Sequence, residues 1–424
     1  MKNLIGGKFV DASNGEKADV INPATNELID TVPLATEEDV DLCVKEAAKA
    51  QKGWAKMPLH ERGEILYKFA DLVESNHEEL AQLLSKETGK PIKEARAEIS
   101  NTKHFIHGYV EKAKHDYGNV IPAGSEVGQE KTMQITVQQP LGVVACIIPF
   151  NFPCDLFGQK VPSALIMGNS VIVKPSTDNP LTLHRYCELL KDAGVPDGVI
   201  NCISGRGSVT GNALAKHPQV ALISVTGSTE VGAEVMANAA ANITHVMLEL
   251  GGNDAFIVMD DADMELTMKE LVWGRLYNTG QVCCASKRFL VQKGIKDEFI
   301  KKAVETLQSL KVAMPQQEDA DIGCLINEKA AINAEEQVRK TLDQGATLVY
   351  GGRRNGAFFE PTILDNVTKD MDVMKDMEIF APVIPVCTFD TLDEALEIAN
   401  QSKFGLCGNI MTSDMKTAFK AAME

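Results

Sequence analysis

The sequence between residues 142 and 249 alternates short apolar runs with longer stretches of helical periodicity. Apolar strands that alternate with helices are typical of a parallel sheet covered by helices on its faces. In such sheets, ligands bind just beyond the carboxyl ends of the strands. The apolar runs span residues 142–150, 170–174, 199–204, 221–226 and 245–249, and the helical patterns span about 158–167, 180–193, 208–216 and 229–240.

A second α/β stretch begins at about residue 253, and its apolar runs span 255–258, 288–291, 347–350 and 384–389. The first 110 residues are helical after a short, turn-rich arm, with a capping-box pattern at Thr36 and Asp39. Residues 118–140 are polar and β-leaning. We therefore predict an α/β fold of two parallel-sheet domains with a small β excursion.

Composition excludes several classes of protein. The 424 residues include 59 acidic and 42 basic side chains, a net charge of −17, so no basic surface for nucleic acid or anionic membrane is expected. The longest apolar stretch, 141–150, is too short to span a bilayer, and the N-terminus turns polar too early for a secretory signal. The ten cysteines contain no CxxC pair, which argues against a zinc ribbon or a disulfide framework. We expect a cytoplasmic protein without a bound metal.

Two adjacent cysteines, Cys283 and Cys284, follow the polar segment Asn278-Thr279-Gly280-Gln281. The other eight cysteines are interpreted as small buried apolar residues. A polar turn that contains glycine can instead hold an accessible thiolate. Adjacent side chains do not easily reach one site, so the pattern predicts one nucleophile and one neighbour.

Two polar residues follow apolar runs at the expected carboxyl edge of the first sheet. Glu249 stands before Leu250 and the paired glycines Gly251 and Gly252, which indicate a close approach of the backbone. A partly desolvated carboxylate is a useful base, although Glu249 can equally face solvent. Asn151 lies between prolines, where it can offer a fixed amide to an oxyanion or simply form a turn.

Glycine-containing segments at the same edge are weaker signals. Residues 226–232 follow an apolar run and open a helical pattern, so their amides can face a phosphate. They lack both the GxGxxG spacing and the Gly-Lys-Ser/Thr of a P-loop. Residues 205–211 are one residue too long for GxGxxG and are interpreted as a turn, with cofactor contact as the alternative. Lys174, at the end of a run, is by default a solvated lysine.

Taken together and in this order, the motifs resemble the aldehyde dehydrogenase superfamily over nearly the whole chain. The matching segments are Ile21-Asn-Pro-Ala-Thr25, Pro149–Pro153, Lys174-Pro-Ser176, Thr226–Gly232, Glu249–Gly252, Gly280-Gln-Val-Cys283, Glu378-Ile-Phe-Ala-Pro382 and Phe404-Gly-Leu406. The resemblance implies a cofactor-binding domain at 1–117 and 141–251, an excursion at 118–140 that bridges subunits, and a catalytic domain at 252–424. The family continues beyond this C-terminus, and the last helix, expected to be capped by Ser413, ends without a stop signal, which suggests truncation.

The resemblance also implies roles for individual residues. Cys283 would be the nucleophile, Glu249 the general base, and Asn151 with the Cys283 N–H the oxyanion hole. Lys174 would hold the adenosine ribose, Glu378 the nicotinamide ribose, and Phe380 would pack beside the nicotinamide. The remaining residues expected to bind NADP or NAD are Pro149, Phe150, Ser176, Thr177, Gly207, Thr226, Gly227, Ser228, Gly232 and Leu250. The expected substrate funnel consists of Phe152, Leu156, Gln159, Tyr277, Val282 and Cys284.

Several residues depart from the family pattern. Phe150 replaces a common tryptophan and Ala381 a usual glycine. Thr177 stands where strictly NAD-dependent relatives often carry a glutamate, so a 2′-phosphate is not repelled and NADP use is expected. Gln159 stands where several semialdehyde-oxidising relatives carry an arginine that binds the substrate carboxylate.

We therefore interpret the chain as an NAD(P)-dependent enzyme that oxidises a small aldehyde to its acid through a Cys283 thiohemiacetal and thioester, and that forms a homodimer or homotetramer. A coenzyme-A-acylating relative is the first alternative, and Glu249 weighs against it because such relatives usually lack the base. A catalytically silent cofactor-binding or structural protein is the second.

Overall fold

The computed structural model describes residues 1–424 and divides the chain into two compact units. Unit 1 comprises residues 1–20, 30–81 and 96–248, and unit 2 comprises residues 21–29, 82–95 and 249–424. The sequence analysis had placed 21–29 and 82–95 in the first domain. Segment 82–95 belongs to unit 2 because its backbone bonds there: Gly89 accepts from the Cys324 N–H at 3.1 Å, and the Ile92 N–H donates to Pro315 at 2.8 Å.

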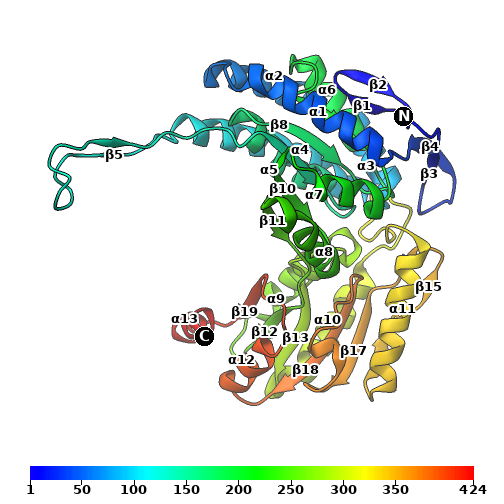
Figure 1. The fold of residues 1–424 in the computed structure, drawn as a ribbon. Coiled ribbons are helices and arrows are strands. Elements are labelled where there is room, and N and C mark those ends of the chain that lie inside the picture. Colours follow the sequence, from blue (N-terminus) through cyan, green and yellow to red (C-terminus); the bar gives the residue numbers. More distant parts are fainter. The chain divides into compact units, whose positions relative to one another are not determined.

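The sheet of unit 1 has seven strands in the order β11-β10-β7-β8-β9-β1-β2 (Figure 1). Its middle strands are parallel, since β7 pairs with β8 and β10, and β8 pairs with β9. The strands that the alternating pattern predicted are β7 (Val143–Ile147), β8 (Ser170–Lys174), β9 (Ile200–Cys202), β10 (Val220–Thr226) and β11 (His245–Glu249).

An N-terminal hairpin extends this sheet, which the sequence analysis missed. β1 (Asn3–Ile5) is buried along its length and pairs antiparallel with β9 and with β2 (Lys8–Val10). Gly6 and Gly7, with φ of +57° and +80°, make the turn between them. Three-residue strands carry too little periodicity to be distinguished from a turn-rich arm. A separate two-stranded sheet is formed by β3 (Lys17–Ile21) and β4 (Leu28–Pro33).

Helices cover both faces of the unit 1 sheet. On one face, Val44 of α1 and Leu214 of α7 pack with Ile172 of β8 in one apolar cluster. On the other, Phe157 of α5 and Tyr186 of α6 meet edge to face, with ring centroids 5.2 Å apart. The helices are α1 (Glu37–Trp54), α2 (Leu59–Ser75), α3 (His77–Thr88), α4 (Ile92–Lys114), α5 (Pro153–Ile166), α6 (Leu181–Ala193), α7 (Asn212–Lys216) and α8 (Thr229–Ala239). The capping box that the sequence predicted at Thr36 and Asp39 begins α1.

Between α4 and β7 the chain forms an extended arm of unit 1 (Figure 1). β5 (Val120–Ile121) and β6 (Gln134–Ile135) pair antiparallel within it. Its apolar side chains face solvent: Tyr117, Val127 and Val137 are 73%, 101% and 70% exposed. An exposed apolar segment of this kind is typical of a surface that another chain covers.

The sheet of unit 2 has six strands in the order β14-β17-β18-β13-β12-β19, all parallel except β14. The strands are β12 (Asp254–Val258), β13 (Ser286–Gln292), β14 (Thr347–Tyr350), β17 (Thr362–Val367), β18 (Val383–Phe389) and β19 (Gly408–Met411), with a small β15 (Arg354–Asn355) and β16 (Phe358–Phe359) pair. Phe299 of α10 packs on Phe289 of β13 on one face, and Val338 of α11 lies in the cluster on the other.

The helices of unit 2 are α9 (Met264–Leu271), α10 (Lys296–Ser309), α11 (Glu328–Asp343), α12 (Leu392–Asn400) and α13 (Met415–Met423). The expectation that Ser413 caps the last helix was wrong. Asp414 is the N-cap, because its carboxylate accepts from the Lys416 and Thr417 N–H groups and a serine one residue earlier does not reach them.

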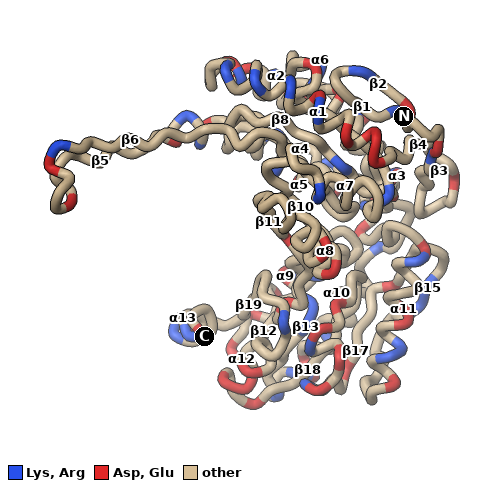
Figure 2. Tube along the Cα trace, in the orientation of Figure 1, with Lys and Arg blue, Asp and Glu red and all other residues tan.

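Acidic and basic side chains are interspersed along the helices of both units, as Figure 2 shows. None of the helices combines the length and the apolar composition that crossing a bilayer requires.

Candidate functional site

The turn before the adjacent cysteines has an unusual backbone. Asn278, Thr279 and Gly280 have φ of +51°, +55° and +75°, so three consecutive residues are left-handed. Left-handed residues other than glycine cost energy and persist only where surrounding contacts hold them. Here the Asn278 N–H donates to Glu94 Oε2 at 2.8 Å, and the side chains of Asn278 and Gln281 each bond to the other's backbone carbonyl.

Gly280 is required at this turn by its surroundings as well as by its φ. A Cβ there would lie 2.5 Å from the Ala381 carbonyl carbon and 2.7 Å from the Pro382 nitrogen. The turn therefore lies directly against the backbone of the Glu378–Pro382 segment. Arg275, which is 1% exposed, joins the two segments. Its guanidinium reaches the Gly280 carbonyl of the turn at 3.5 Å and donates to the carbonyls of Val383 at 2.6 Å, Ile379 at 2.9 Å and Ala381.

The thiols of Cys283 and Cys284 share a hydrogen bond, and this bond dominates their titration. It lowers the pKa of Cys284 to about 6 and raises that of Cys283, which burial raises further. Because one proton lies between two sulfurs, the pair loses its first proton easily and its second with difficulty. The shared proton therefore favours a thiolate on one of the two sulfurs, and the choice of nucleophile stays a prediction of the sequence analysis. Cys283 is half-buried and Cys284 exposed.

A buried lysine lies behind the thiols. Lys287, on β13, has a side chain only 1% exposed, and its Nζ donates to the Cys283 carbonyl at 2.5 Å and pairs with Glu378 Oε1 at 3.0 Å. The Phe380 ring centroid is 5.7 Å from the same nitrogen. Burial lowers the pKa of Lys287, and the Glu378 carboxylate opposes this shift. Sequence patterns gave no indication of Lys287.

The paired glycines before β12 lie against the same groups, and they make the close backbone approach that the sequence analysis expected. A Cβ at Gly251 would lie 2.5 Å from Glu378 Oε2, and one at Gly252 would lie 2.7 Å from the Cys283 carbonyl oxygen. The Gly252 N–H also points to Glu378 Oε1, at 3.5 Å. Glu249 ends β11 with an exposed side chain, and Leu250 is half-buried.

Asp254 and Cys407 complete the surroundings of the thiols. Asp254 is 2% exposed; its Oδ1 accepts from the Cys407 N–H at 3.0 Å, and its Oδ2 has no hydrogen-bond partner. Burial raises the pKa of Asp254. Cys407 is exposed, contrary to the expectation that all eight remaining cysteines are buried, because it precedes the edge strand β19. The other seven are buried.

In unit 1, Asn151 lies just beyond the carboxyl end of β7 and is 6% exposed. Asn179 fixes the preceding residue, since its Nδ2 donates to the Phe150 carbonyl at 2.9 Å. Pro149 and Phe150 are half-buried. Of the predicted funnel residues, half-buried Phe152 is the N-cap of α5, and half-buried Leu156 and exposed Gln159 lie within that helix. In unit 2, Tyr277 and Val282 are half-buried.

The predicted cofactor residues of unit 1 follow the carboxyl ends of β8, β9 and β10. Lys174 is 5% exposed, not solvated as its default interpretation held; its Nζ donates to Pro175 at 3.1 Å, and burial lowers its pKa to about 8. Thr226 ends β10, and Ser228 caps α8 by accepting from the Val231 N–H at 3.3 Å. The other members are half-buried Ser176, Thr177 and Gly227, buried Gly232 and exposed Gly207, which begins a π-helical turn.

Two buried polar atoms at this edge lack a partner within the protein: Thr226 Oγ1 and Asn179 Oδ1. Buried polar atoms are almost always hydrogen-bonded, so these two fit a site that a polar ligand completes. The residues present therefore fit a dinucleotide, with a cation at Lys174 and the N-terminus of a helix at the start of α8.

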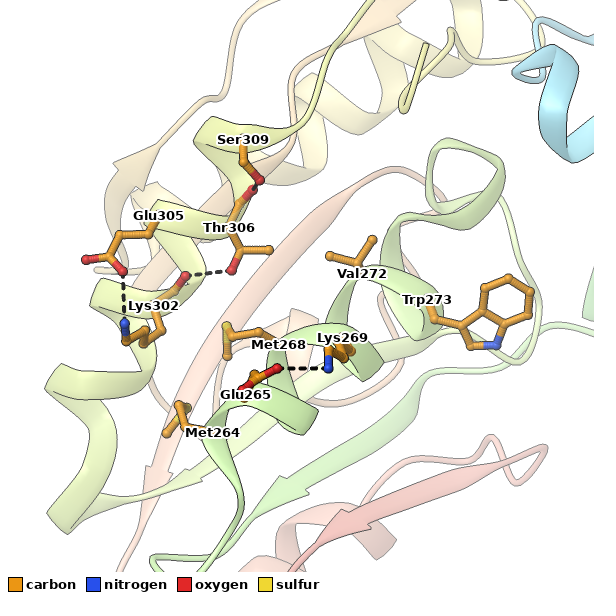
Figure 3. Close-up of a pocket in the computed structure, with 10 residues that line it drawn as sticks. All are labelled: Met264, Glu265, Met268, Lys269, Val272, Trp273, Lys302, Glu305, Thr306 and Ser309. Atoms are coloured by element: carbon orange, nitrogen blue, oxygen red, sulfur yellow. Dashed lines mark hydrogen bonds and ion pairs between the residues drawn. The ribbon is translucent and has the colours of Figure 1, made fainter. Parts of the chain in front are cut away.

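A groove of about 830 Å³ between α9 and α10 lies elsewhere in unit 2 (Figure 3). Met264, Met268 and Val272 line it, and its lysines are already paired, Lys269 with Glu265 at 2.9 Å and Lys302 with Glu305 at 3.2 Å. Trp273 at its end packs on Tyr277, with ring centroids 4.7 Å apart. Its two glutamates and two lysines neutralise one another in these pairs, and we assign the groove no chemistry.

Sequence comparison supports an enzyme of the kind the motifs resemble. The model of the aldehyde dehydrogenase family matches residues 9–424. The chain is 38% identical to D-glyceraldehyde dehydrogenase (NADP(+)) of Picrophilus torridus, over 100% of this chain and 86% of that protein. It is 37% identical to lactaldehyde dehydrogenase of Escherichia coli, over 98% and 87%.

Solved structures agree with the fold. A 3,6-anhydro-L-galactose dehydrogenase in complex with NAP superposes with a TM-score of 0.96 at 36% identity, covering 100% of this chain and 89% of the other. Succinate-semialdehyde dehydrogenase from Burkholderia pseudomallei gives a TM-score of 0.97 at 34% identity, covering 100% and 87%.

Proposed function

The chain belongs to the aldehyde dehydrogenase family, and from this premise we propose that it oxidises a small aldehyde to the carboxylic acid through a covalent Cys283 intermediate. The observation that carries this proposal is the turn at 277–284. Three left-handed residues and a glycine in backbone contact fix the position of two adjacent thiols, and the hydrogen bond between these thiols lowers the pKa of Cys284, which supports a reactive sulfur at this turn.

Cys283 attacks the carbonyl carbon of the aldehyde and gives a thiohemiacetal. We assign the attack to Cys283, although the lower pKa belongs to Cys284, because the shared proton can pass to the neighbour and leave the thiolate on Cys283. The exposed Cys284 then borders the substrate. Lys287 adds a positive charge that favours the thiolate of either sulfur.

Asn151 and the Cys283 N–H stabilise the oxyanion that forms on the substrate oxygen. The support for Asn151 is its low exposure and the fixed backbone before it, together with the family pattern. Loss of a hydride converts the thiohemiacetal into a thioester. Glu249 activates the water that hydrolyses this thioester and releases the acid. Its exposed carboxylate at the end of β11 is open to solvent water.

The nicotinamide of NADP or NAD, when bound, accepts the hydride that the thiohemiacetal releases. Lys174 and the amides at the start of α8 would hold the adenosine and phosphate portions, and Glu378 would hold the nicotinamide ribose beside Phe380. Thr177 places no carboxylate near the adenosine ribose. We therefore propose that NADP is accepted at least as well as NAD.

The test is aldehyde-dependent formation of NADPH or NADH, followed at 340 nm, with short aldehydes such as glyceraldehyde, lactaldehyde and succinate semialdehyde. Each reaction is run with and without coenzyme A, and the product is identified by mass spectrometry. We expect free acid in both. An acyl-coenzyme-A product would show that the thioester is transferred to coenzyme A and not hydrolysed. Cofactor binding without any product would indicate a catalytically silent protein.

We further propose that the protein is a cytoplasmic homodimer or homotetramer. The support for self-association is the exposed apolar arm around β5 and β6. Light scattering after gel filtration should give a mass two or four times that of the chain. Replacement of Val120, Ile135 and Val137 by serine should lower that mass, and cell fractionation tests the compartment.

A further inference from the structure

Lys287 is a buried cation with three neighbours that belong to different parts of the site. Its Nζ lies 2.5 Å from the Cys283 carbonyl oxygen and 3.0 Å from Glu378 Oε1, and 5.7 Å from the centre of the Phe380 ring. The nucleophile turn and the Glu378–Pro382 segment therefore meet at one ammonium group. Three donor protons can serve both oxygens at once.

Burying a charge of this kind is costly unless the fold uses it. A lysine side chain that is 1% exposed loses most of its hydration, and one carboxylate that is itself 21% exposed returns only part of the energy. A methionine of similar length would fill the same space without that cost. A purely structural explanation is therefore weaker for Lys287 than for the exposed lysines of unit 2.

The Lys287 charge acts on the neighbouring thiols as well as on the carboxylates around it. Glu378 pairs with it, the carboxyl of Asp254 lies on the neighbouring strand β12, and the guanidinium of Arg275 is also close enough to act on it. The Lys287 charge lowers the pKa of Cys283 and of Cys284, whereas the Asp254 carboxylate raises the pKa of Cys284 and of Cys407. Any change in how firmly Glu378 holds Lys287 thus changes the field at the thiols.

We propose that Lys287 is a positioning residue that links the carboxylate of Glu378 to the backbone of the Cys283 turn. This inference rests on the proposed function for the assignment of Glu378 to the nicotinamide ribose. Lys287 orients that carboxylate from one side while Gly251 and Gly252 confine it from the other, at the distances given above. The same nitrogen donates to the Cys283 carbonyl, so Lys287 fixes the position of the Glu378 carboxylate relative to the nucleophile turn.

Two consequences can be measured separately. The first is the reactivity of the thiols in the absence of cofactor and substrate, which depends on the Lys287 charge. The second is the affinity for the nicotinamide cofactor, which depends on the orientation of Glu378. A residue that only filled space would not change the pH profile of thiol reactivity. It would also not make the cofactor affinity depend jointly on residue 287 and Glu378.

The first experiment measures the rate of iodoacetamide alkylation of Cys283 and Cys284 as a function of pH, with mass mapping of the modified residue. Lys287→Met should move the midpoint of the rate profile upward by about one pH unit, the lower end of the effect of one nearby opposite charge. Lys287→Arg should restore most of the shift. Lys296→Met is the matched control, because it breaks the 2.8 Å ion pair with Asp365 in the same unit but has no contact with the thiols.

The second experiment measures dissociation constants for NADP and NAD by calorimetry in the wild type, Lys287→Met, Glu378→Gln and the double variant. Each single variant should weaken binding about tenfold, the lower range for one charge-assisted hydrogen bond. The double variant should be no weaker than the worse single variant, because both remove the same link. Glu378→Gln should also move the alkylation midpoint downward, opposite to Lys287→Met, since it leaves the lysine charge uncompensated.

The outcomes decide the inference. Opposite shifts in the two single variants, rescue by arginine and an unchanged Lys296→Met profile support it. An unchanged Lys287→Met profile overturns it, and so does a shift that arginine fails to rescue, because the role is then structural. If Lys287→Met does not fold, the direction of the Glu378→Gln shift decides alone. The alkylation arm needs no aldehyde, so a wild type that oxidises nothing contradicts the proposed function and leaves this test intact.

Discussion

Arg275→Met should loosen the nucleophile turn without touching a reacting group. The guanidinium is buried and donates to the carbonyls of Val383 and Ile379 at 2.6 and 2.9 Å and to that of Ala381, with Gly280 more distant at 3.5 Å. No carboxylate pairs with it directly. Methionine retains the apolar stem of the arginine and removes every donor.

The magnitude follows from the carbonyls left behind. The Ala381 carbonyl keeps a second bond from the Val383 N–H at 2.7 Å, so it is not left unpaired. Each of the other carbonyls loses a charge-assisted bond, at a cost of about 1–3 kcal/mol for a buried acceptor. Relief from burying a cation offsets part of this cost. We therefore expect a local loss of ~2–4 kcal/mol.

Hydrogen exchange resolved by segment is the suitable assay, because one melting temperature does not describe a chain with two units. Peptides that cover 278–284 and 379–383 should exchange roughly 30- to 1,000-fold faster in the variant, since about 1.4 kcal/mol is tenfold. Strand β8 in unit 1 is the internal control. Arg275→Lys keeps the charge but not the planar set of donors, so its exchange rates should lie between those of the wild type and Arg275→Met. Exchange within twofold of the wild type in both segments would refute the reasoning.

Further predictions address the reaction and its pH dependence. Cys283→Ser should abolish aldehyde oxidation while calorimetry still detects cofactor binding, whereas Cys284→Ala should retain activity; the reverse result would move the nucleophile by one residue. Glu249→Gln should give a burst of NADPH or NADH followed by turnover slowed roughly 10²–10⁴-fold, because hydrolysis loses its base and hydride transfer does not; an unchanged steady-state rate would contradict this role. Thr177→Glu should shift the ratio of kcat/KM for NADP over NAD toward NAD by about 1–3 kcal/mol, and a wild type that strongly prefers NAD would oppose the idea. Burial raises the folded-state pKa of Asp254, so the stability that this carboxyl contributes is full below its unfolded pKa and is lost as pH rises through the folded value. In urea unfolding, Asp254→Asn should therefore be more stable than the wild type at neutral pH, and the difference in unfolding free energy should close toward pH 4. A difference that is constant with pH would exclude this cause.

The sequence by itself determined the parts of the protein that depend on local patterns. The alternation of apolar runs and helices predicted the parallel strands from β7 to β10, because a buried strand and an amphipathic helix each leave their own periodicity. Residues that lie next to one another in the chain, such as Cys283 beside Cys284 or Gly251 beside Gly252, could be interpreted as a thiol pair and a close approach. The ordered motifs then indicated the family.

Only the tertiary structure decided which distant residues support that site. Lys287, Arg275 and Glu94 lie in segments with no motif, and a buried lysine has the same letter in the sequence as an exposed one. Lys174 was at a predicted strand end, yet the sequence did not show that it is buried, since its burial depends on how β8 packs and not on its neighbours in the chain. β1 joined the sheet for a related reason: its three residues gain their stability from pairing with β9, a partner almost 200 residues away, as the Leu4–Cys202 register shows. Periodicity records what each segment buries, whereas hydrogen bonds and ion pairs between segments form only after the chain has brought them together.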